Sequence, residues 1–327
     1  MELPPALRQA VDRLLERTPL TELQKAAGLL SGRYRAEVRD GRLHLDDRLA
    51  VKAYLATRLP ATYAAIRASL AQVAGSHPQF APRALLDVGA GPGSVLWAAS
   101  DCWPTLTDAV MLEASAAARE IGEQLAGIAP VATTRWLTAD ITRGRPDLPK
   151  ADLVTLSYVL DEIAPAELET IVDRLWSATT GVLVIIEPGT PAGWRRVLAA
   201  RERLTRSGAH LLAPCPHIAP CPLVAPDWCH FARRVARSRL HRLTKGGEIP
   251  WEDEKYIFVA ASRLPGDTVS ARVLAPPRTA KGMIRLKLCR ADATVTDRTV
   301  TKREGGAFRA ARRLDWGDSV EVEGELG

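Results

Sequence analysis

The stretch Leu85-Leu-Asp-Val-Gly-Ala-Gly-Pro-Gly93 decides the fold of this chain. Its apolar first half predicts a short buried strand. The glycines at 89, 91 and 93 predict a tight turn that opens the N-terminus of the following helix toward a ligand. Glu113 ends the next predicted strand, at a spacing from the glycines that suits an acid holding ribose hydroxyls. The motif therefore predicts a nucleoside site beside a strand of an α/β fold.

Strands and helices alternate along the chain from this motif onward. Apolar segments predict strands at 110–113, 136–140, 151–157, 181–187 and 256–261, with helices between them. This alternation is typical of a parallel sheet covered by helices. We therefore predict three parts: a helical region at 1–80, a Rossmann-like sheet domain at 81–263 and a small, β-rich, basic region at 264–327. The sheet domain holds a cysteine-containing insertion at 188–254.

The spacing of the glycines distinguishes this site from a dinucleotide site. A dinucleotide turn reads Gly-x-Gly-x-x-Gly, whereas here the third glycine comes one residue earlier, after Pro92. The pattern resembles motif I of the class I S-adenosylmethionine-dependent methyltransferases, with a nucleotide oxidoreductase as the alternative. The resemblance implies that Glu113 binds the ribose and Asp140 the adenine amino group. The residues expected to bind the cofactor are Asp87, Gly89, Gly91, Gly93, Glu113, Asp140 and Ser157.

In those methyltransferases the segment that matches Ser157-Tyr-Val-Leu-Asp-Glu162 lines the substrate side. It lacks the Asn/Asp-Pro-Pro-Tyr/Phe signature of base-amino methylases and the cysteine of C5-pyrimidine methylases. Asp161 and Glu162 are candidates for a general base. An acidic pair at the start of a helix, where it complements the helix dipole, is the alternative interpretation.

Three cysteines lie in a proline-rich stretch, Ala213-Pro-Cys-Pro-His-Ile-Ala-Pro-Cys-Pro-Leu-Val-Ala-Pro-Asp-Trp-Cys-His230. So many prolines exclude a helix or a central strand. Several thiols in one irregular loop are typical of a metal site, since thiolates are ligands of zinc and of iron–sulfur clusters. Cys289 is a candidate fourth ligand. His217 and His230 are possible nitrogen ligands if the metal is zinc, and Cys102 is expected to pack in the sheet domain.

Basic residues gather in the last third of the chain, although the net charge of the whole chain is only +6. From Arg263 to Arg313 there are 13 Lys and Arg against four Asp and Glu, and residues 230–247 hold six basic residues and no acid. Clustered cations indicate a polyanionic partner, most simply RNA. Acids at the end of the chain, from Asp315 to Glu325, reduce this positive charge.

Composition limits the class of protein. The apolar fraction is 46% and the charged fraction 25%, which is ordinary for a globular enzyme. No apolar run approaches the length of about 18 residues that a membrane span needs. The first residues lack the apolar core of a secretory signal and the acid-poor composition of a transit peptide. These features predict a cytoplasmic protein with no membrane partner.

Several motifs together resemble the methyltransferase-like family of mitochondrial small-ribosomal-subunit assembly proteins and their bacterial homologues. The matching stretches are 86–93, 157–162, Gly208-Ala-His-Leu-Leu-Ala-Pro-Cys-Pro-His217, Cys221, Asp227-Trp-Cys-His-Phe231 and Leu286-Lys-Leu-Cys-Arg290.

This resemblance implies a class I fold that keeps an S-adenosylmethionine pocket. It also implies a 4Fe–4S cluster on Cys215, Cys221, Cys229 and Cys289, and association with small-subunit ribosomal RNA or a pre-ribosomal particle. The expected function is that of an rRNA methyltransferase or of a non-catalytic assembly factor. The alternative is a small-molecule S-adenosylmethionine-dependent methyltransferase with a structural zinc.

Overall fold

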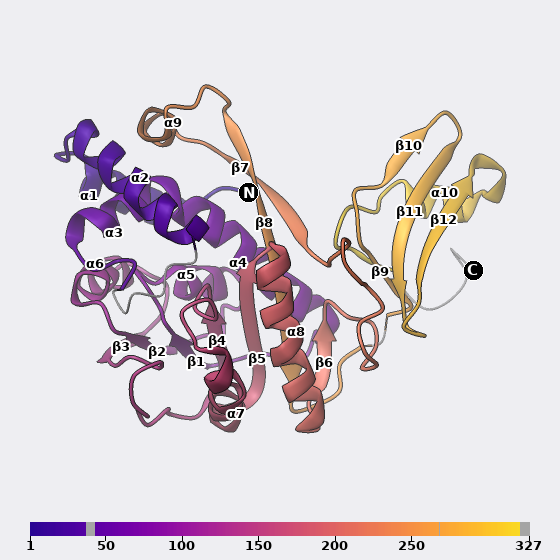
Figure 1. Cartoon of the computed structure of the whole chain (residues 1–327), viewed down its shortest axis with the longest axis horizontal. Coiled ribbons are helices and arrows are strands. Elements are labelled where there is room, and N and C mark those ends of the chain that lie inside the picture. Colours follow the sequence, from indigo (N-terminus) through magenta and orange to yellow (C-terminus); the bar gives the residue numbers. More distant parts are fainter. Residues whose placement is uncertain (37–42, 268, 321–327) are drawn as a thin grey trace.

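The computed structural model describes residues 1–36, 43–267 and 269–320, which form two β-sheets of unequal size (Figure 1). The larger sheet has the strand order β3-β2-β1-β4-β5-β8-β6, and β7 also pairs with β8. Its strands are β1 (Ala84–Val88), β2 (Asp108–Glu113), β3 (Thr133–Thr138), β4 (Ala151–Ser157), β5 (Thr179–Pro188), β6 (His210–Ala213), β7 (Phe231–Ala236) and β8 (Trp251–Ser262).

The first five strands of this sheet are parallel, and β8 runs antiparallel to its neighbours β5, β6 and β7. The order of the strands reverses between β1 and β4, where loops diverge and α/β folds bind their ligands. The predicted α/β class with a mainly parallel sheet is confirmed.

Helices connect the strands and cover the sheet. The connecting helices are α5 (Ser94–Cys102), α6 (Ala116–Ala126), η1 (Pro165–Glu167), α7 (Leu168–Ala178), α8 (Pro191–Arg206) and α9 (Arg239–Lys245). Four further helices precede β1, namely α1 (Pro5–Leu15), α2 (Leu20–Ala36), α3 (Arg48–Thr57) and α4 (Leu59–Ser76). Helix α4 packs against α5 and β8, and α2 packs against α3 and α9. The N-terminal helices therefore share one hydrophobic core with the large sheet.

The predicted insertion at 188–254 contains regular secondary structure, namely the helices α8 and α9 and the strands β6 and β7. Strand β6 is short, and β7 reads Phe-Ala-Arg-Arg-Val-Ala, so neither has the long apolar pattern of a central strand. Phe231 and Val235 of β7 are nevertheless buried. The division of the chain at residues 80 and 263 stays a prediction.

The small sheet has the order β10-β11-β9-β13, with β12 paired to β11, and a hydrophobic core of its own. Ile284, Leu286 and Leu288 are buried in alternation along β11, as expected for a strand with one covered face. Its elements are β9 (Ala271–Val273), β10 (Arg278–Ala280), β11 (Met283–Arg290), β12 (Val295–Thr301), η2 (Lys302–Glu304), α10 (Gly306–Ala311) and β13 (Ser319–Val320).

No helix in the described ranges is long and apolar enough to cross a membrane. The acids Glu321, Glu323 and Glu325, which enter the charge balance of the sequence, lie outside the described residues.

Candidate functional site

The glycine-rich turn after β1 forms one wall of a pocket of about 550 Å³. Gly89, Gly91 and Gly93 all have positive φ angles, of 70°, 53° and 88°. A Cβ atom on Gly89 would lie 2.4 Å from Cγ2 of Val159, so this position admits only glycine. Gly93 is the N-cap of α5, and Gly89 and Gly91 line the pocket.

The three acids predicted to bind the nucleoside line this same pocket. Glu113, at the end of β2, accepts hydrogen bonds from the backbone N–H groups of Gly91 and Ser115, each at 2.7 Å. Asp140, just after β3, accepts from the N–H and the hydroxyl of Thr142, at 2.8 and 2.6 Å. These hydrogen bonds hold both carboxylates at the pocket edge.

Asp87 lies deepest of the three, with no exposed surface. One carboxylate oxygen accepts a hydrogen bond of 2.7 Å from Thr155, and the other has no partner among the described residues. Burial raises the pKa of Asp87 to about 7, and the nearby charge of Glu113 contributes to this increase. The group therefore titrates near neutral pH.

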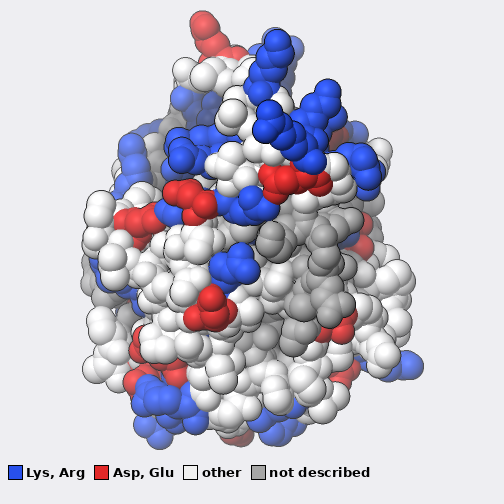
Figure 2. All heavy atoms as spheres, turned by 90° about the vertical axis from the view of Figure 1, so that its right-hand side faces the viewer, with Lys and Arg blue, Asp and Glu red and all other residues white. Residues whose placement is uncertain are grey.

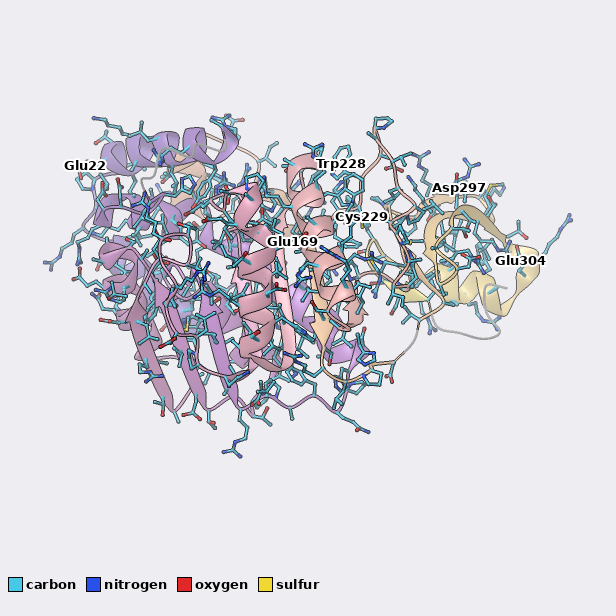
Figure 3. All side chains as sticks on the ribbon, turned by 60° about the horizontal axis from the view of Figure 1, so that its bottom comes forward. Glu22, Glu169, Trp228, Cys229, Asp297 and Glu304 are labelled. Carbon is cyan, nitrogen blue, oxygen red and sulfur yellow. The ribbon has the colours of Figure 1, made fainter. Side chains whose placement is uncertain are left out.

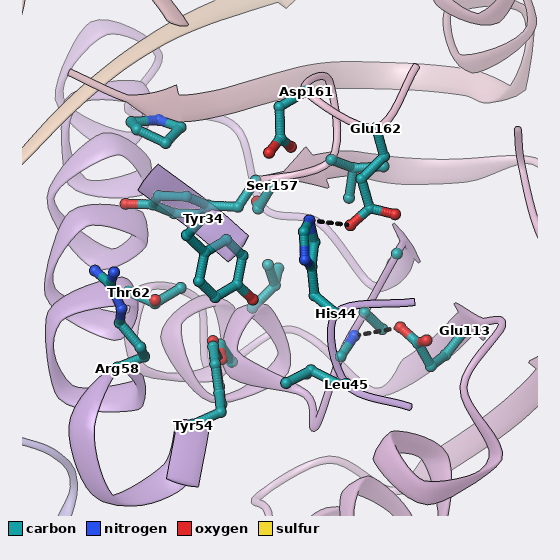
Figure 4. A pocket seen from close by; sticks show the side chains of 18 of the residues that line it. Tyr34, His44, Leu45, Tyr54, Arg58, Thr62, Glu113, Ser157, Asp161 and Glu162 are labelled. Atoms are coloured by element: carbon teal, nitrogen blue, oxygen red, sulfur yellow. Dashed lines mark hydrogen bonds and ion pairs between the residues drawn. The ribbon is translucent and has the colours of Figure 1, made fainter. Parts of the chain in front are cut away.

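The N-terminal helices build the opposite wall of the pocket (Figure 4). Tyr34, His44, Tyr54 and Arg58 project into it, although residues 1–80 carry no motif that predicts a role. His44 is buried and lies 4.7 Å from the ring of Tyr34, and Arg58 stacks over that ring at 5.4 Å. Only the folded arrangement brings these side chains to the site, so the sequence analysis missed them.

Ser157, Asp161 and Glu162 also line the pocket, as predicted. Asp161 and Glu162 lie in a turn, and the next helical segment begins only at Pro165, so neither occupies the first turn of a helix. Oε1 of Glu162 is 3.7 Å from Nε2 of His44. Burial, followed by the neighbouring charges of Asp161 and Glu113, raises the pKa of Glu162 to about 8.

Tyr158 links this turn to the strand β8. Its φ angle is 60°, an unusual value for an aromatic residue. Its hydroxyl donates a hydrogen bond of 3.2 Å to Glu254, another residue of the pocket wall. Strained backbone of this kind is found mainly at functional sites.

The four cysteines of the predicted metal site surround a second, small cavity of about 30 Å³. Cys215, Cys221 and Cys229 come from the irregular segment between β6 and β7, and Cys289 comes from β11 of the small sheet. Figure 3 places Cys229 between the large sheet and the small sheet. Cys289 is therefore close in space to the other three cysteines, although it is far from them in the sequence.

The four thiols line one cavity, but they are not arranged as the ligands of a metal ion. In the described part of the chain no group of three or more His, Cys, Asp and Glu side chains is arranged to hold a metal ion, so the predicted cluster is not shown. Burial and the nearby thiols raise the pKa of Cys289 to about 12, and burial raises the pKa of Cys229 well above its usual value.

The other residues considered as metal ligands, His217, His230 and Cys102, differ in whether they line the thiol cavity. Nε2 of His217 lies 3.4 Å from Sγ of Cys289, and His217 lines the thiol cavity. The ring of His230 instead stacks on Trp228 and meets the edge of Trp316. Cys102 ends α5 in the sheet domain and is not among the residues that line the cavity.

The two runs of basic residues found in the sequence have different surroundings in the structure. In the run at 230–247, Arg234 pairs with Asp253 of β8, while Arg237 and Lys245 both pair with Glu252. The acids that were absent from the run in sequence thus face it across the β7–β8 ladder.

Most basic side chains of the small sheet are exposed, and Figure 2 shows Lys and Arg gathered in the upper part of this end of the molecule. We call them the small-sheet cations; they are Arg278, Lys281, Arg285, Lys302, Arg303, Arg309, Arg312 and Arg313.

The strand order and the turn after β1 define a protein with a Rossmann-like fold of the class I methyltransferase type. Solved structures with this kind of fold are similar to the chain. Magnesium protoporphyrin IX methyltransferase from Synechocystis, with bound SAM, is 14% identical, covers 71% of this chain and 90% of its own, and has a TM-score of 0.42. An O-methyltransferase family protein from Burkholderia thailandensis is 14% identical over 76% and 72% of the two chains, with a TM-score of 0.44.

A family profile described as mitochondrial small ribosomal subunit Rsm22 matches residues 48–321, so the chain belongs to the Rsm22 family. The human ribosome assembly protein METTL17, mitochondrial, is 27% identical over 82% of this chain and 62% of its own length. The mitochondrial Rsm22-cox11 tandem protein 2 of Schizosaccharomyces pombe is 26% identical over 84% and 44%. The chain thus spans about half to three fifths of the length of these relatives.

These names correct the prediction of a cytoplasmic protein. The family is described as mitochondrial and so are the relatives, which points to the mitochondrion rather than the cytoplasm. That prediction rested on the composition of the first residues, which in the structure form α1, with Leu7 and Val11 buried in the core.

Proposed function

We propose that this chain is an S-adenosylmethionine-binding, iron–sulfur methyltransferase-like protein that acts with small-subunit ribosomal RNA during ribosome assembly. The observation that carries the proposal is the pocket at the switch point of the sheet, where three glycines with positive φ face Glu113 and Asp140. Membership of the Rsm22 family supports the ribosomal part. The names of the relatives METTL17 and Rsm22-cox11 agree with it.

In this proposal the nucleoside end of the pocket binds the methyl donor. Glu113 holds the ribose hydroxyls and Asp140 the adenine amino group, while Gly89 and Gly91 let the backbone approach the ligand. The acids already sit in fixed hydrogen bonds, so the site needs little reorganisation to bind. Asp87 and Ser157 complete the cofactor side.

The opposite wall supports methyl transfer as the activity of the pocket. Glu162, paired with His44, is the general base, because a pKa of about 8 allows it to exchange a proton near neutral pH. Tyr34 and Arg58 offer stacking surfaces for a planar acceptor such as a nucleobase. Holding donor and acceptor together would supply most of the rate increase.

The thiol cavity fits the iron–sulfur part of the proposal. Four thiols from two separate segments line one cavity, and four cysteine thiolates are the usual ligands of a 4Fe–4S cluster. When bound, the cluster would supply four iron–thiolate bonds that join the segment between β6 and β7 to β11. Zinc on the same thiols is the alternative metal, with His217 as the nearest nitrogen ligand.

The small-sheet cations are the proposed contact with rRNA. They are exposed, whereas three basic side chains of the 230–247 run are paired with acids of β8. Clustered, exposed cations bind phosphates, and such binding weakens as salt rises. We expect the small sheet, more than the β7 segment, to determine RNA affinity.

Two matched quadruple variants test this proposal. One changes Arg278, Lys281, Arg285 and Arg303 of the small sheet to Gln, and the other changes Arg233, Arg234, Arg237 and Arg239 to Gln. Affinity for small-subunit rRNA is measured by anisotropy between about 50 and 200 mM salt. The first variant should bind at least tenfold more weakly and with a smaller salt dependence, and the second should change affinity less.

The proposal is contradicted if both variants bind as the wild type does, or if wild-type affinity does not change with salt. Calorimetry with S-adenosylmethionine on the same proteins separates the two halves of the proposal. The donor pocket is intact in both variants, so its affinity should stay constant. Absence of any S-adenosylmethionine binding by the wild type would instead remove the methyltransferase half.

A further inference from the structure

Two buried arginines line the thiol cavity together with the four cysteines. Arg201 lies on α8 and Arg272 on β9, and each has only 3% of its surface exposed. Helix α8 packs on the large sheet, whereas β9 belongs to the small sheet. In the sequence Arg272 counts only as one of the 13 basic residues that indicate an RNA partner, and Arg201 belongs to no motif.

Each guanidinium is only partly satisfied by hydrogen bonds. Arg201 donates to the carbonyl oxygens of His217 and Ala219, at 2.9 and 2.7 Å. Arg272 donates to the carbonyl oxygens of Pro214 and Gly317, at 2.8 and 3.0 Å. Nε of Arg201 and Nη2 of Arg272 are buried and find no acceptor in the described ranges.

Each arginine interacts electrostatically with more than one thiol, and Cys289 interacts with both. Arg201 interacts electrostatically with Cys221 and Cys289. Arg272 interacts with Cys215, Cys229 and Cys289, and also with the negative charge of Asp318. Across the described residues neither arginine forms an ion pair with a carboxylate.

Two cations in a nearly dry cavity need a negative partner, because an ionised group buried without one is strongly unfavourable. Four thiolates around a 4Fe–4S core with two positive charges leave two net negative charges, and four thiolates on a zinc ion leave the same. These two negative charges would balance the two positive charges of the guanidiniums.

We propose that Arg201 and Arg272 are the counter-charges of the metal centre: they position its thiolates and raise its reduction potential. This inference rests on the proposed cluster. It assigns a role to two residues that do not line the methyltransferase pocket. Reduction adds one electron to a centre that is already negative, so a nearby cation favours the reduced form. Net charge and hydrogen bonds to sulfur are among the factors that set the potential of such centres.

The test uses the full chain, purified anaerobically, with Arg201→Met, Arg272→Met and Arg272→Lys. Iron and zinc per chain are measured together with the midpoint potential. We expect each Met variant to hold less than half of the wild-type iron, and its remaining centre to have a more negative potential. Arg272→Lys keeps the charge and should recover most of the iron and the potential.

The matched control is Arg263→Met. Arg263 also donates to two backbone carbonyl groups, those of Thr179 and Trp176, and it is not among the residues that line the cavity. Its loss should leave metal content and potential unchanged. A merely structural role of Arg272 would make the Lys variant as defective as the Met variant and would leave the potential of the residual centre unaltered.

The outcomes are distinguishable. A metal-loaded wild type with both Met variants unchanged in metal and potential overturns the counter-charge inference and leaves the cluster in place. A wild type that holds neither iron nor zinc overturns the cluster and this inference together. A zinc-loaded wild type refutes the cluster alone, and loss of zinc in the Met variants then supports the counter-charge role.

Discussion

The nucleoside pocket and the thiol cavity solve the problem of burying polar groups in opposite ways. In the pocket, backbone N–H groups already hold the carboxylate of Glu113, and Thr142 holds that of Asp140. In the cavity, buried guanidiniums retain donors without acceptors among the described residues, and burial raises the pKa values of Cys229 and Cys289. The carboxylates of Glu113 and Asp140 are thus held before a ligand arrives, although one oxygen of Asp87 and the hydroxyl of Ser157 have no partner among the described residues.

This difference predicts that loss of the ligand lowers the stability of the fold by different amounts at the two sites. The empty pocket should leave the fold stable, whereas the empty cavity leaves an irregular segment held by side-chain contacts such as those of Arg201 and Arg272 with its backbone. Metal-binding free energy becomes folding free energy in such a segment. The predictions below test this contrast, starting from the largest expected effect.

The first prediction concerns the four thiols. Each of Cys215→Ser, Cys221→Ser, Cys229→Ser and Cys289→Ser should lose most of the iron, about four atoms per chain, and the brown colour of the anaerobic protein. Each should also lower the melting temperature, since one ligand bond fewer weakens the link between the two sheets. Metal analysis and circular dichroism measure both effects.

Cys102→Ser is the control and should keep its iron, because Cys102 lies in α5 and not beside the cavity. Full iron in Cys289→Ser would show that the fourth ligand is another residue, with His217 the first to examine. Wild-type melting temperatures in all four variants would contradict the contrast itself.

The second prediction concerns the pocket. Gly91→Asp and Glu113→Ala should weaken S-adenosylmethionine binding at least tenfold. Losing a charge-assisted hydrogen bond costs roughly 1.5–3 kcal/mol, and a factor of ten is about 1.4 kcal/mol. Isothermal calorimetry measures the affinity, with Glu123→Ala of the exposed face of α6 as control.

The melting temperature of these pocket variants without ligand sharpens the comparison. Glu113→Ala should melt within a few degrees of the wild type, unlike the cysteine variants. Equal affinity of Gly91→Asp, Glu113→Ala and the wild type would remove the assignment of this pocket to the methyl donor.

The third prediction, with the smallest effect, concerns pH. The pKa of Asp87 is raised to about 7 by burial, so the carboxyl is largely protonated at a pH of about 6 and largely ionised at about 8. S-adenosylmethionine carries a fixed positive sulfonium, which favours the ionised carboxylate. Its affinity should therefore rise severalfold between about pH 6 and 8, with proton release on binding.

S-adenosylhomocysteine, which lacks that charge, serves as the matched ligand and should show a flatter pH profile. Asp87→Asn should flatten the profile for S-adenosylmethionine as well. Calorimetry in two buffers of different ionisation enthalpy counts the released protons. Equal pH profiles for the two ligands would show that Asp87 does not respond to the sulfonium.

The sequence predicts well what is local in the chain. The turn 85–93 and the acid at the end of the next strand lie within 30 residues of each other, so the motif alone predicts a strand, a turn and the position of Glu113. The alternation of strands and helices predicts the sheet in the same way. These features depend on neighbours along the chain.

What the sequence could not predict depends on long-range packing. Tyr34, His44 and Arg58 reach the pocket only because the N-terminal helices fold over the sheet. The basic run at 230–247 contains no acid, yet β8 brings Glu252 and Asp253 to it. Strands β6 and β7 were missed, since the first is short and the second is rich in arginine.

The position of Cys289 has a consequence for the synthesis of the protein. The ribosome makes Cys215, Cys221 and Cys229 first, and Cys289 follows only after α9, β8 and most of the small sheet's β11 have been translated. The proposed cluster can therefore be completed only after β11 of the small sheet has been made. A product that terminates before residue 289 would carry only three of the four thiols and could not complete the site.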